Sequence, residues 1–190
     1  MITFDPVLHV YQLGDRRLPS VTEILQALGI VRVYGSNANN ALRGKAVHEA
    51  CCLYDSNLLD ESETSPEVMC YVNSWKQFIA STKPTVEMSE QIVWSDEYEA
   101  AGTVDRVLKF PDTRIVVTEL KTGSERDWHR LQSAMYCKLL EVNNYHVDDA
   151  LLVYLKGDGK YKSVYLSEED IAAGSHTLEA WKWLRKRKVF

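Results

Sequence analysis

The sequence lacks long hydrophobic runs, clustered cysteines and internal repeats. No apolar run approaches the length of a membrane-spanning helix, and residues 1–5 lack the basic-then-apolar pattern of a signal peptide. These absences favour a cytoplasmic protein without a membrane partner. The four cysteines show no C-x-x-C spacing, which argues against a structural zinc site and predicts reduced thiols: Cys51, Cys52, Cys70 and Cys137.

A surplus of positive charge is also missing. The formal net charge is −5, and a negative total disfavours the attraction of phosphate and hence nucleic-acid binding. The distribution weakens that argument, because acidic residues gather at 60–63 in an expected surface loop, while Lys and Arg gather at 181–188. This basic run is either a DNA-binding arm or an ordinary cation-rich helix end.

Length and hydrophobic pattern predict a single α/β domain over residues 1–190, with a central mixed sheet flanked by helices. The hydrophobic content of 45% is ordinary for a globular protein. Apolar periodicity predicts helices over 21–28, 41–54, 67–80 and 125–143, strands over 7–13, 85–95, 101–107, 116–123 and 149–155, and a loop over 31–40.

The strands over 101–107 and 116–123 are separated by Pro111-Asp112-Thr113, which predicts an antiparallel hairpin. A turn centred on the aspartate places Asp105 opposite Glu119. Thr103 then lies opposite the residue two positions beyond Glu119.

The residue opposite Thr103 is Lys121. It shares a face with Glu119, because residues two apart on a strand point to the same side. Opposed Cβ atoms lie roughly 4.5–5.5 Å apart, so Asp105, Glu119 and Lys121 converge on one face of the hairpin. A slip of one residue would turn Asp105 to the other face.

Two carboxylates held this close require a cation, a shared proton or abundant water. A hard divalent ion such as Mg²⁺ or Mn²⁺ suits their oxygen ligands, and the neighbouring lysine can orient or deprotonate a water. The set suits metal-assisted hydrolysis of a phosphodiester. The alternative is an exposed strand face carrying ordinary cross-strand ion pairs.

The motif Gly102-Thr103-Val104-Asp105, followed after a spacer by Glu119-Leu120-Lys121-Thr122-Gly123, resembles the core of PD-(D/E)XK nucleases, in the RecB-like and Cas4-like exonuclease branch. The resemblance implies a restriction-endonuclease-like fold. It also implies that Asp105, Glu119 and the carbonyl of Leu120 are metal ligands and that Lys121 is the catalytic lysine. Val104 stands where the family name has proline, which is common in this branch.

Three other segments extend the resemblance. Arg43-Gly44-Lys45-Ala46-Val47-His48 resembles the Arg-Gly-x-x-x-His motif, which implies that His48 is a metal ligand and Arg43 an accessory residue, although a lone helical histidine is more often structural. Gln132 and Tyr136 are four residues apart and match the Gln-x-x-x-Tyr motif, whose members support the active site. Glu90 lies in a row with Val86, Met88 and Ile92 on one predicted strand face, as an accessory site residue, a salt-bridge partner or an exposed strand end.

The segment Pro19-Ser20-Val21-Thr22 opens a helix, with Ser20 as N-cap and Glu23 completing a capping box. Together with the upstream His9-x-Tyr11, it resembles the opening of phage-type and mitochondrial-genome-maintenance-type exonucleases. Ser20 and Thr22 are therefore either DNA contacts at a helix N-terminus or simply the cap of a packed helix.

The resemblance implies a Mg²⁺- or Mn²⁺-dependent DNA exonuclease with one or two ions, acting on linear DNA with ends in phage or bacterial recombination or repair. A single-strand annealing protein is the implied partner. The cysteine spacing does not match that of relatives with an iron–sulfur cluster, so no cluster is expected. A structure-specific or nicking endonuclease and a nonenzymatic DNA-end-binding subunit are the two alternatives.

Overall fold

A computed structural model describes residues 1–31 and 38–189 of the chain. Its centre is a five-stranded sheet in which the strands follow one another in chain order. The sheet consists of β4 (Thr85–Ser95), β5 (Ala100–Lys109), β6 (Ile115–Lys121), β7 (Asp149–Leu155) and β8 (Tyr161–Tyr165). The β6–β7 pair is parallel and the other three pairs are antiparallel, so the predicted α/β fold with a mixed sheet is confirmed.

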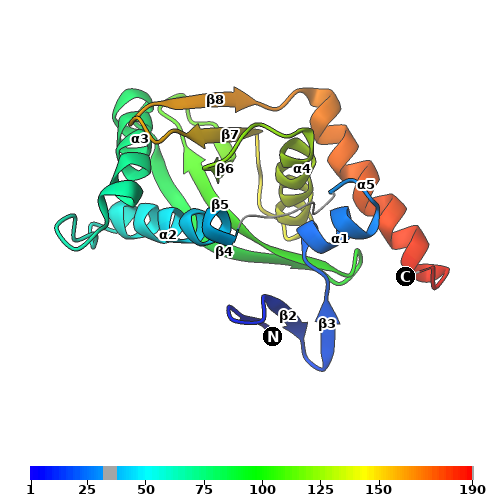
Figure 1. Ribbon diagram of the computed structural model, residues 1–190. Coiled ribbons are helices and arrows are strands. Elements are labelled where there is room, and N and C mark those ends of the chain that lie inside the picture. Colours follow the sequence, from blue (N-terminus) through cyan, green and yellow to red (C-terminus); the bar gives the residue numbers. More distant parts are fainter. Residues whose placement is uncertain (32–37, 190) are drawn as a thin grey trace.

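Helices cover both faces of this sheet (Figure 1). They are α1 (Val21–Ala27), α2 (Ala38–Asp55), α3 (Pro66–Thr82), α4 (Asp127–Val142) and α5 (Glu168–Lys186). Among the described residues, no helix is both long and apolar enough to cross a membrane. The predicted loop over 31–40 lies mostly outside the described residues, and its last three residues belong to α2.

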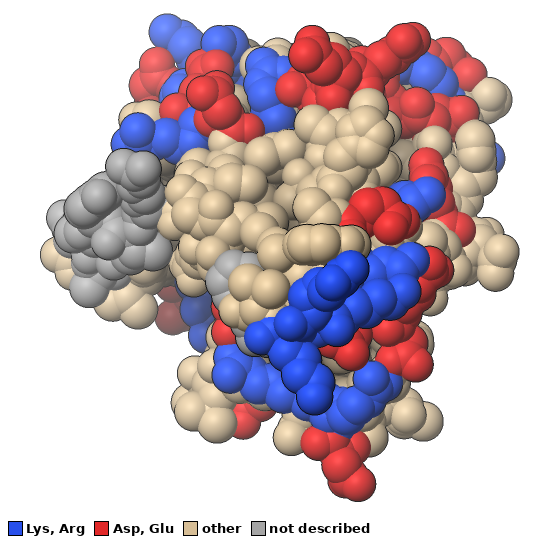
Figure 2. All heavy atoms as spheres, turned by 90° about the vertical axis from the view of Figure 1, so that its right-hand side faces the viewer, with Lys and Arg blue, Asp and Glu red and all other residues tan. Residues whose placement is uncertain are grey.

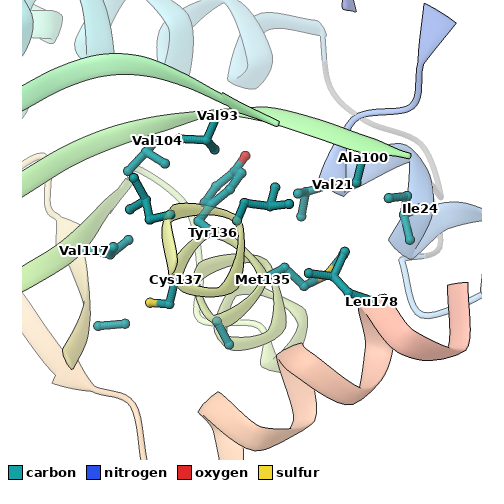
Figure 3. Packing of buried hydrophobic residues seen from close by; sticks show 14 of the residues in the cluster. Val21, Ile24, Val93, Ala100, Val104, Val117, Met135, Tyr136, Cys137 and Leu178 are labelled. Carbon is teal, nitrogen blue, oxygen red and sulfur yellow. The ribbon is translucent and has the colours of Figure 1, made fainter. Parts of the chain in front are cut away.

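Alternation along β7 divides the core between the two faces, because successive side chains of a strand point in opposite directions. Ala150, Leu152 and Tyr154 pack in the cluster with α4 and α5, which Figure 3 shows around Met135 and Leu178. The intervening Leu151, Val153 and Leu155 pack with α2 and α3. Burial on both faces accounts for the almost continuous apolar sequence of this strand.

A second, three-stranded sheet is formed by β1 (Ile2–Asp5), β2 (Val10–Leu13) and β3 (Arg16–Leu18). The strand predicted over 7–13 therefore begins only at Val10, because His9 has a left-handed φ of 52° in the turn before it. The main-chain N–H of Ala101 donates to the carbonyl of Pro19, which ties this segment to the start of β5.

The predicted hairpin register is confirmed from the turn as far as Arg106, which pairs with Thr118. The β5–β6 ladder ends there, so the predicted pairing of Thr103 with Lys121 is not part of it. On the other side of β5, a register shift between Val86 and Met88 interrupts the pairing with β4.

The prediction that four alternating residues of β4 share one face is wrong. The register shift and a left-handed φ of 49° at Glu90 break the alternation of the strand. As a result Val86, Met88 and Ile92 pack against three different apolar clusters.

Candidate metal and catalytic site

One small cavity of about 230 Å³ gathers nearly all the predicted site residues. It lies where α1, α2 and α4 meet the strands β2, β4, β5 and β6. Its lining residues are His9, Tyr11, Ser20, Thr22, His48, Glu90, Thr103, Asp105, Glu119, Lys121, Gln132 and Tyr136. The predicted residues outside this lining are Arg43 and Leu120, which line an adjacent groove together with His48.

Beyond the last ladder pair, Asp105 makes the hydrogen bonds that join β5 to β6. Its Oδ2 accepts from the main-chain N–H of Leu120 at 2.8 Å, and its own main-chain N–H donates to Glu119 Oε1 at 3.2 Å. These bonds hold the two carboxylates in fixed positions, with Glu119 only 1% exposed. Leu120 is buried, and its role as a ligand through its carbonyl remains a prediction.

His48, Glu90 and Asp105 form a group whose ligand atoms all lie within 4.8 Å of one another. The imidazole Nδ1 of His48 lies 3.2 Å from Asp105 Oδ1. One nitrogen ligand and two carboxylates form a donor set that suits a divalent metal. Glu119 is not a member of this group, and its two oxygens accept from the main-chain N–H of Asp105 and from Lys121 Nζ.

The pKa values of Asp105 and Glu119 are shifted in opposite directions. Burial alone would raise the pKa of Asp105, but the charges of His48 and Lys121 outweigh it and lower that pKa. For Glu119, burial and the charge of Asp105 raise the pKa, and Lys121 offsets only part of this. Asp105 is therefore ionised in the free protein, whereas Glu119 holds a proton more readily.

Lys121 is held by two acceptors on different elements. Its Nζ donates to Glu119 Oε2 at 3.1 Å and to Gln132 Oε1 on α4 at 2.9 Å. Burial acts to lower the pKa of this amine, but Glu119 and Asp105 outweigh it and raise the pKa. The amine is therefore positively charged at neutral pH and acts as a hydrogen-bond donor.

Gln132 connects this lysine to the rest of the site. Its Nε2 lies 3.4 Å from both Thr22 Oγ1 and the Tyr136 hydroxyl, so one amide spans α1, α4 and β6. Tyr136 projects from α4 towards the strands that carry Val93 and Val104 (Figure 3). The ring lies against Gly102, where an added Cβ would come within 2.4 Å of it, so only glycine leaves room for this tyrosine.

The predicted cap of α1 is confirmed. Ser20 Oγ accepts from the N–H of Glu23 at 3.1 Å, and Glu23 Oε2 accepts from the N–H of Ser20 at 2.8 Å. Ile24 and Leu25 are fully buried, so this helix packs as the structural interpretation requires. A DNA-contact role for Ser20 and Thr22 remains a prediction.

A buried ion pair beneath the site was not predicted. Arg106 is fully buried, and its Nε lies 2.5 Å from Asp55 Oδ2 at the end of α2. Its Nη1 lies 3.0 Å from Glu90 Oε1, so the same guanidinium pairs with a member of the His48, Glu90 and Asp105 group. The rival interpretation of Glu90 as a salt-bridge partner is therefore confirmed, and it coexists with a place in the site.

Two further side chains in the cavity escaped sequence reasoning. The Tyr11 hydroxyl lies 2.8 Å from Thr103 Oγ1, which joins the small sheet to β5. His9 stacks edge-on against Phe4 and Tyr11 and also lines the cavity. The His9-x-Tyr11 spacing in the sequence was the available signal, but it did not predict a contact between the two sheets.

Comparisons with known proteins identify a shared fold. No family model matches the chain, and no curated protein matches it. A solved protein of Eubacterium rectale, to which an exonuclease activity is provisionally attributed, has a TM-score of 0.51 at 10% identity, covering 83% of this chain and 69% of its own. An alkaline exonuclease of Laribacter hongkongensis has a TM-score of 0.41 at 13% identity, over 90% of this chain and 92% of its own. The first likeness shows the fold alone, and the second score is too low to argue from.

Proposed function

We propose that the protein is a metal-dependent deoxyribonuclease that degrades linear DNA from its ends. The observation that carries the proposal is the convergence of His48, Glu90 and Asp105 beside the ammonium of Lys121 in one cavity. The motif resemblance to the RecB-like and Cas4-like branch supports it. So does the fold shared with a protein to which exonuclease activity is attributed.

The residues present fit Mg²⁺ or Mn²⁺. His48, Glu90 and Asp105 would hold the ion, and Glu119, whose Oε1 accepts from the main-chain N–H of Asp105, would be a further ligand. A bound divalent ion would lower the pKa of a coordinated water and stabilise negative charge on the phosphate. Burial, followed by the charge of Asp105, raises the pKa of Glu90. A bound divalent ion would offset the repulsion between these two carboxylates.

Lys121 supplies the positive donor of the reaction. Its raised pKa keeps it protonated, so it orients the attacking water or stabilises charge on the phosphate oxygens rather than removing a proton. Gln132 on α4 fixes the direction of the amine by accepting its second hydrogen bond. The chain thus positions its cation on two acceptors before substrate binds.

The proposal is tested on end-labelled linear DNA and covalently closed circular DNA with Mn²⁺, Mg²⁺ or EDTA. Wild type is compared with Lys121→Ala and with Lys109→Ala, which changes an exposed lysine at the opposite end of β5. We expect metal-dependent loss of linear DNA only, abolished in Lys121→Ala and retained in Lys109→Ala.

Cutting of the circle would replace the exonuclease by a nicking or structure-specific endonuclease. No cleavage of either DNA by a folded wild type, with both metals, would leave a DNA-end-binding subunit. A cytoplasmic role in phage or bacterial recombination or repair, beside a single-strand annealing protein, is a further part of the proposal and rests on the motif resemblance.

A further inference from the structure

A larger groove of about 1040 Å³ opens onto the metal site. The groove and the site cavity share Thr22, His48 and Lys121 in their walls. From this shared wall the groove runs between α2 and the start of α4, past the ends of β6 and β7. Gly44 on α2 lies against Thr122 across it, where an added Cβ would be 3.6 Å from Thr122 Oγ1.

The described residues that line this groove include four Lys or Arg side chains and no Asp or Glu. Besides Lys121 they are Arg43, Arg126 and Lys156. This lining is therefore positively charged, although the whole chain has a net charge of −5. Local charge decides where an anionic polymer binds, so the groove is the favoured path for phosphates.

Arg43 is held ready for an anion. Its guanidinium lies 5.4 Å from the centroid of the Tyr71 ring, and its Nη1 is 3.6 Å from Glu67, a side chain that is 68% exposed. Its Nε is buried without a hydrogen-bond partner in the described structure. The side chain as a whole is 25% exposed, so its other donors can meet a phosphate in the groove.

Two aromatic rings belong to the same lining as the four cations. Trp128 and Tyr71 are half-buried, and Trp128 is fixed edge-on against His129 with ring centroids 4.2 Å apart. Cationic grooves with aromatic side chains are typical of proteins that bind single-stranded nucleic acids, whose unpaired bases can stack. The bases of a duplex are already stacked on one another and cannot use these rings.

We infer that the groove binds a single strand of DNA, a few nucleotides long, and leads its end to the metal site. The aromatic rings beside the four cations favour a single strand over a duplex, whose bases are already stacked. The inference rests on the proposed function and adds the strandedness of the substrate, with Trp128 as the stacking residue.

The test measures binding separately from cleavage. Fluorescence anisotropy of a labelled single strand and of a blunt duplex of equal length is recorded with Ca²⁺ in place of Mg²⁺ or Mn²⁺. We expect the single strand to bind at least about tenfold more tightly. Trp128→Ala and Arg126→Ala should each weaken single-strand binding by about tenfold, while Lys109→Ala leaves it unchanged.

Thermal unfolding of each variant checks the fold, and Trp128→Leu replaces Trp128→Ala if the latter unfolds. Equal or tighter binding of the blunt duplex would overturn the inference, and so would wild-type affinity in both groove variants. Cleavage of DNA with Mn²⁺ in those cases would still support the proposed nuclease. Single-strand binding without any cleavage would instead overturn the nuclease and leave the groove assignment standing.

Discussion

At the residue scale, the amide of Gln132 is central to the site. It gives Lys121 a second hydrogen-bond acceptor besides Glu119. Gln132→Leu removes this acceptor and the donor to Thr22 while keeping much of the side-chain volume. We expect nuclease activity to fall by roughly 10–100-fold, the usual cost of losing a group that orients a catalytic ligand.

The measurement is the rate of linear-DNA degradation with saturating Mn²⁺. Gln12→Leu, an exposed position on β2, is the matched control and should keep full activity. Wild-type activity in Gln132→Leu would show that Glu119 alone positions the lysine.

His129 gives a pH-dependent contribution to stability. It is buried with its Nδ1 3.1 Å from the Tyr154 hydroxyl, and burial, followed by the charge of Lys121, lowers its pKa to about 3. Between that value and the ordinary pKa of about 6.5 the unfolded chain binds a proton that the folded chain does not. The contribution is therefore complete above about pH 6.5 and is lost as the pH falls.

We expect His129→Asn, which keeps an acceptor near Tyr154, to flatten the loss of stability between neutral pH and pH ~4 by about 1 kcal/mol or more. Urea unfolding at several pH values measures this. The control is His146→Asn, in which the replaced side chain is 79% exposed. An unchanged slope in His129→Asn would assign the acid sensitivity to other groups.

At the element scale, the packing of α5 on α4 depends on one small residue. A Cβ at Gly174 would lie 2.4 Å from Ala134 Cβ and 2.7 Å from its main-chain carbon. Because backbone atoms cannot rotate away, we expect Gly174→Ala to lower the free energy of unfolding by about 1–3 kcal/mol.

Gly44→Ala is the matched control, since it is also a helical glycine but its Cβ would meet only Thr122 Oγ1, at 3.6 Å. It should be neutral or stabilising by up to ~1 kcal/mol, because alanine favours the helix. Denaturant unfolding of both variants decides. Equal stabilities would mean that α5 shifts to make room.

Sequence reasoning succeeded where short-range rules act. The turn at Pro111-Asp112-Thr113 fixed the hairpin register, which the pairing of Arg106 with Thr118 confirms. It failed for the single face expected along β4, because the register shift between Val86 and Met88 and the left-handed backbone at Glu90 have no local sequence signal. The Arg106–Asp55 pair could not be predicted either, since it joins residues 51 positions apart on two elements.

At the scale of the whole molecule, metal binding at the proposed site should increase global stability. The site concentrates buried carboxylates that a divalent ion would neutralise, and a ligand that binds only the folded state at 100 times its Kd stabilises by about 2.7 kcal/mol. For a chain of this size, that corresponds to a rise in Tm of roughly 5–10 °C.

Differential scanning calorimetry with Mn²⁺, Mg²⁺ or EDTA tests this coupling. We expect a larger shift with Mn²⁺ than with Mg²⁺, because the set contains an imidazole. Asp105→Asn should abolish the shift, while Asp112→Asn at the exposed turn should preserve it. A full shift in Asp105→Asn would place the metal elsewhere on the protein.

The surface that carries α5 shows a dense group of Lys and Arg beside acidic residues (Figure 2). Part of this charge is already neutralised, since Lys182 pairs with Glu97 at 2.5 Å and Arg185 with Glu99 at 2.8 Å. The arm interpretation therefore depends on the last residues of the run, such as Lys186 and Arg187, which are exposed.

The salt dependence of single-strand binding separates this surface from the groove. Neutralisation of three phosphates by Arg43, Arg126 and Lys156 predicts a slope of log K against log salt of about −2, at roughly −0.7 per phosphate. Arg126→Ala should reduce the slope by ~0.7, and Lys186→Ala should leave it unchanged. A steeper wild-type slope that becomes shallower in Lys186→Ala would mean that the strand, or a duplex behind it, also crosses the end of α5. The groove and the end of α5 would then form one basic path on an otherwise acidic molecule.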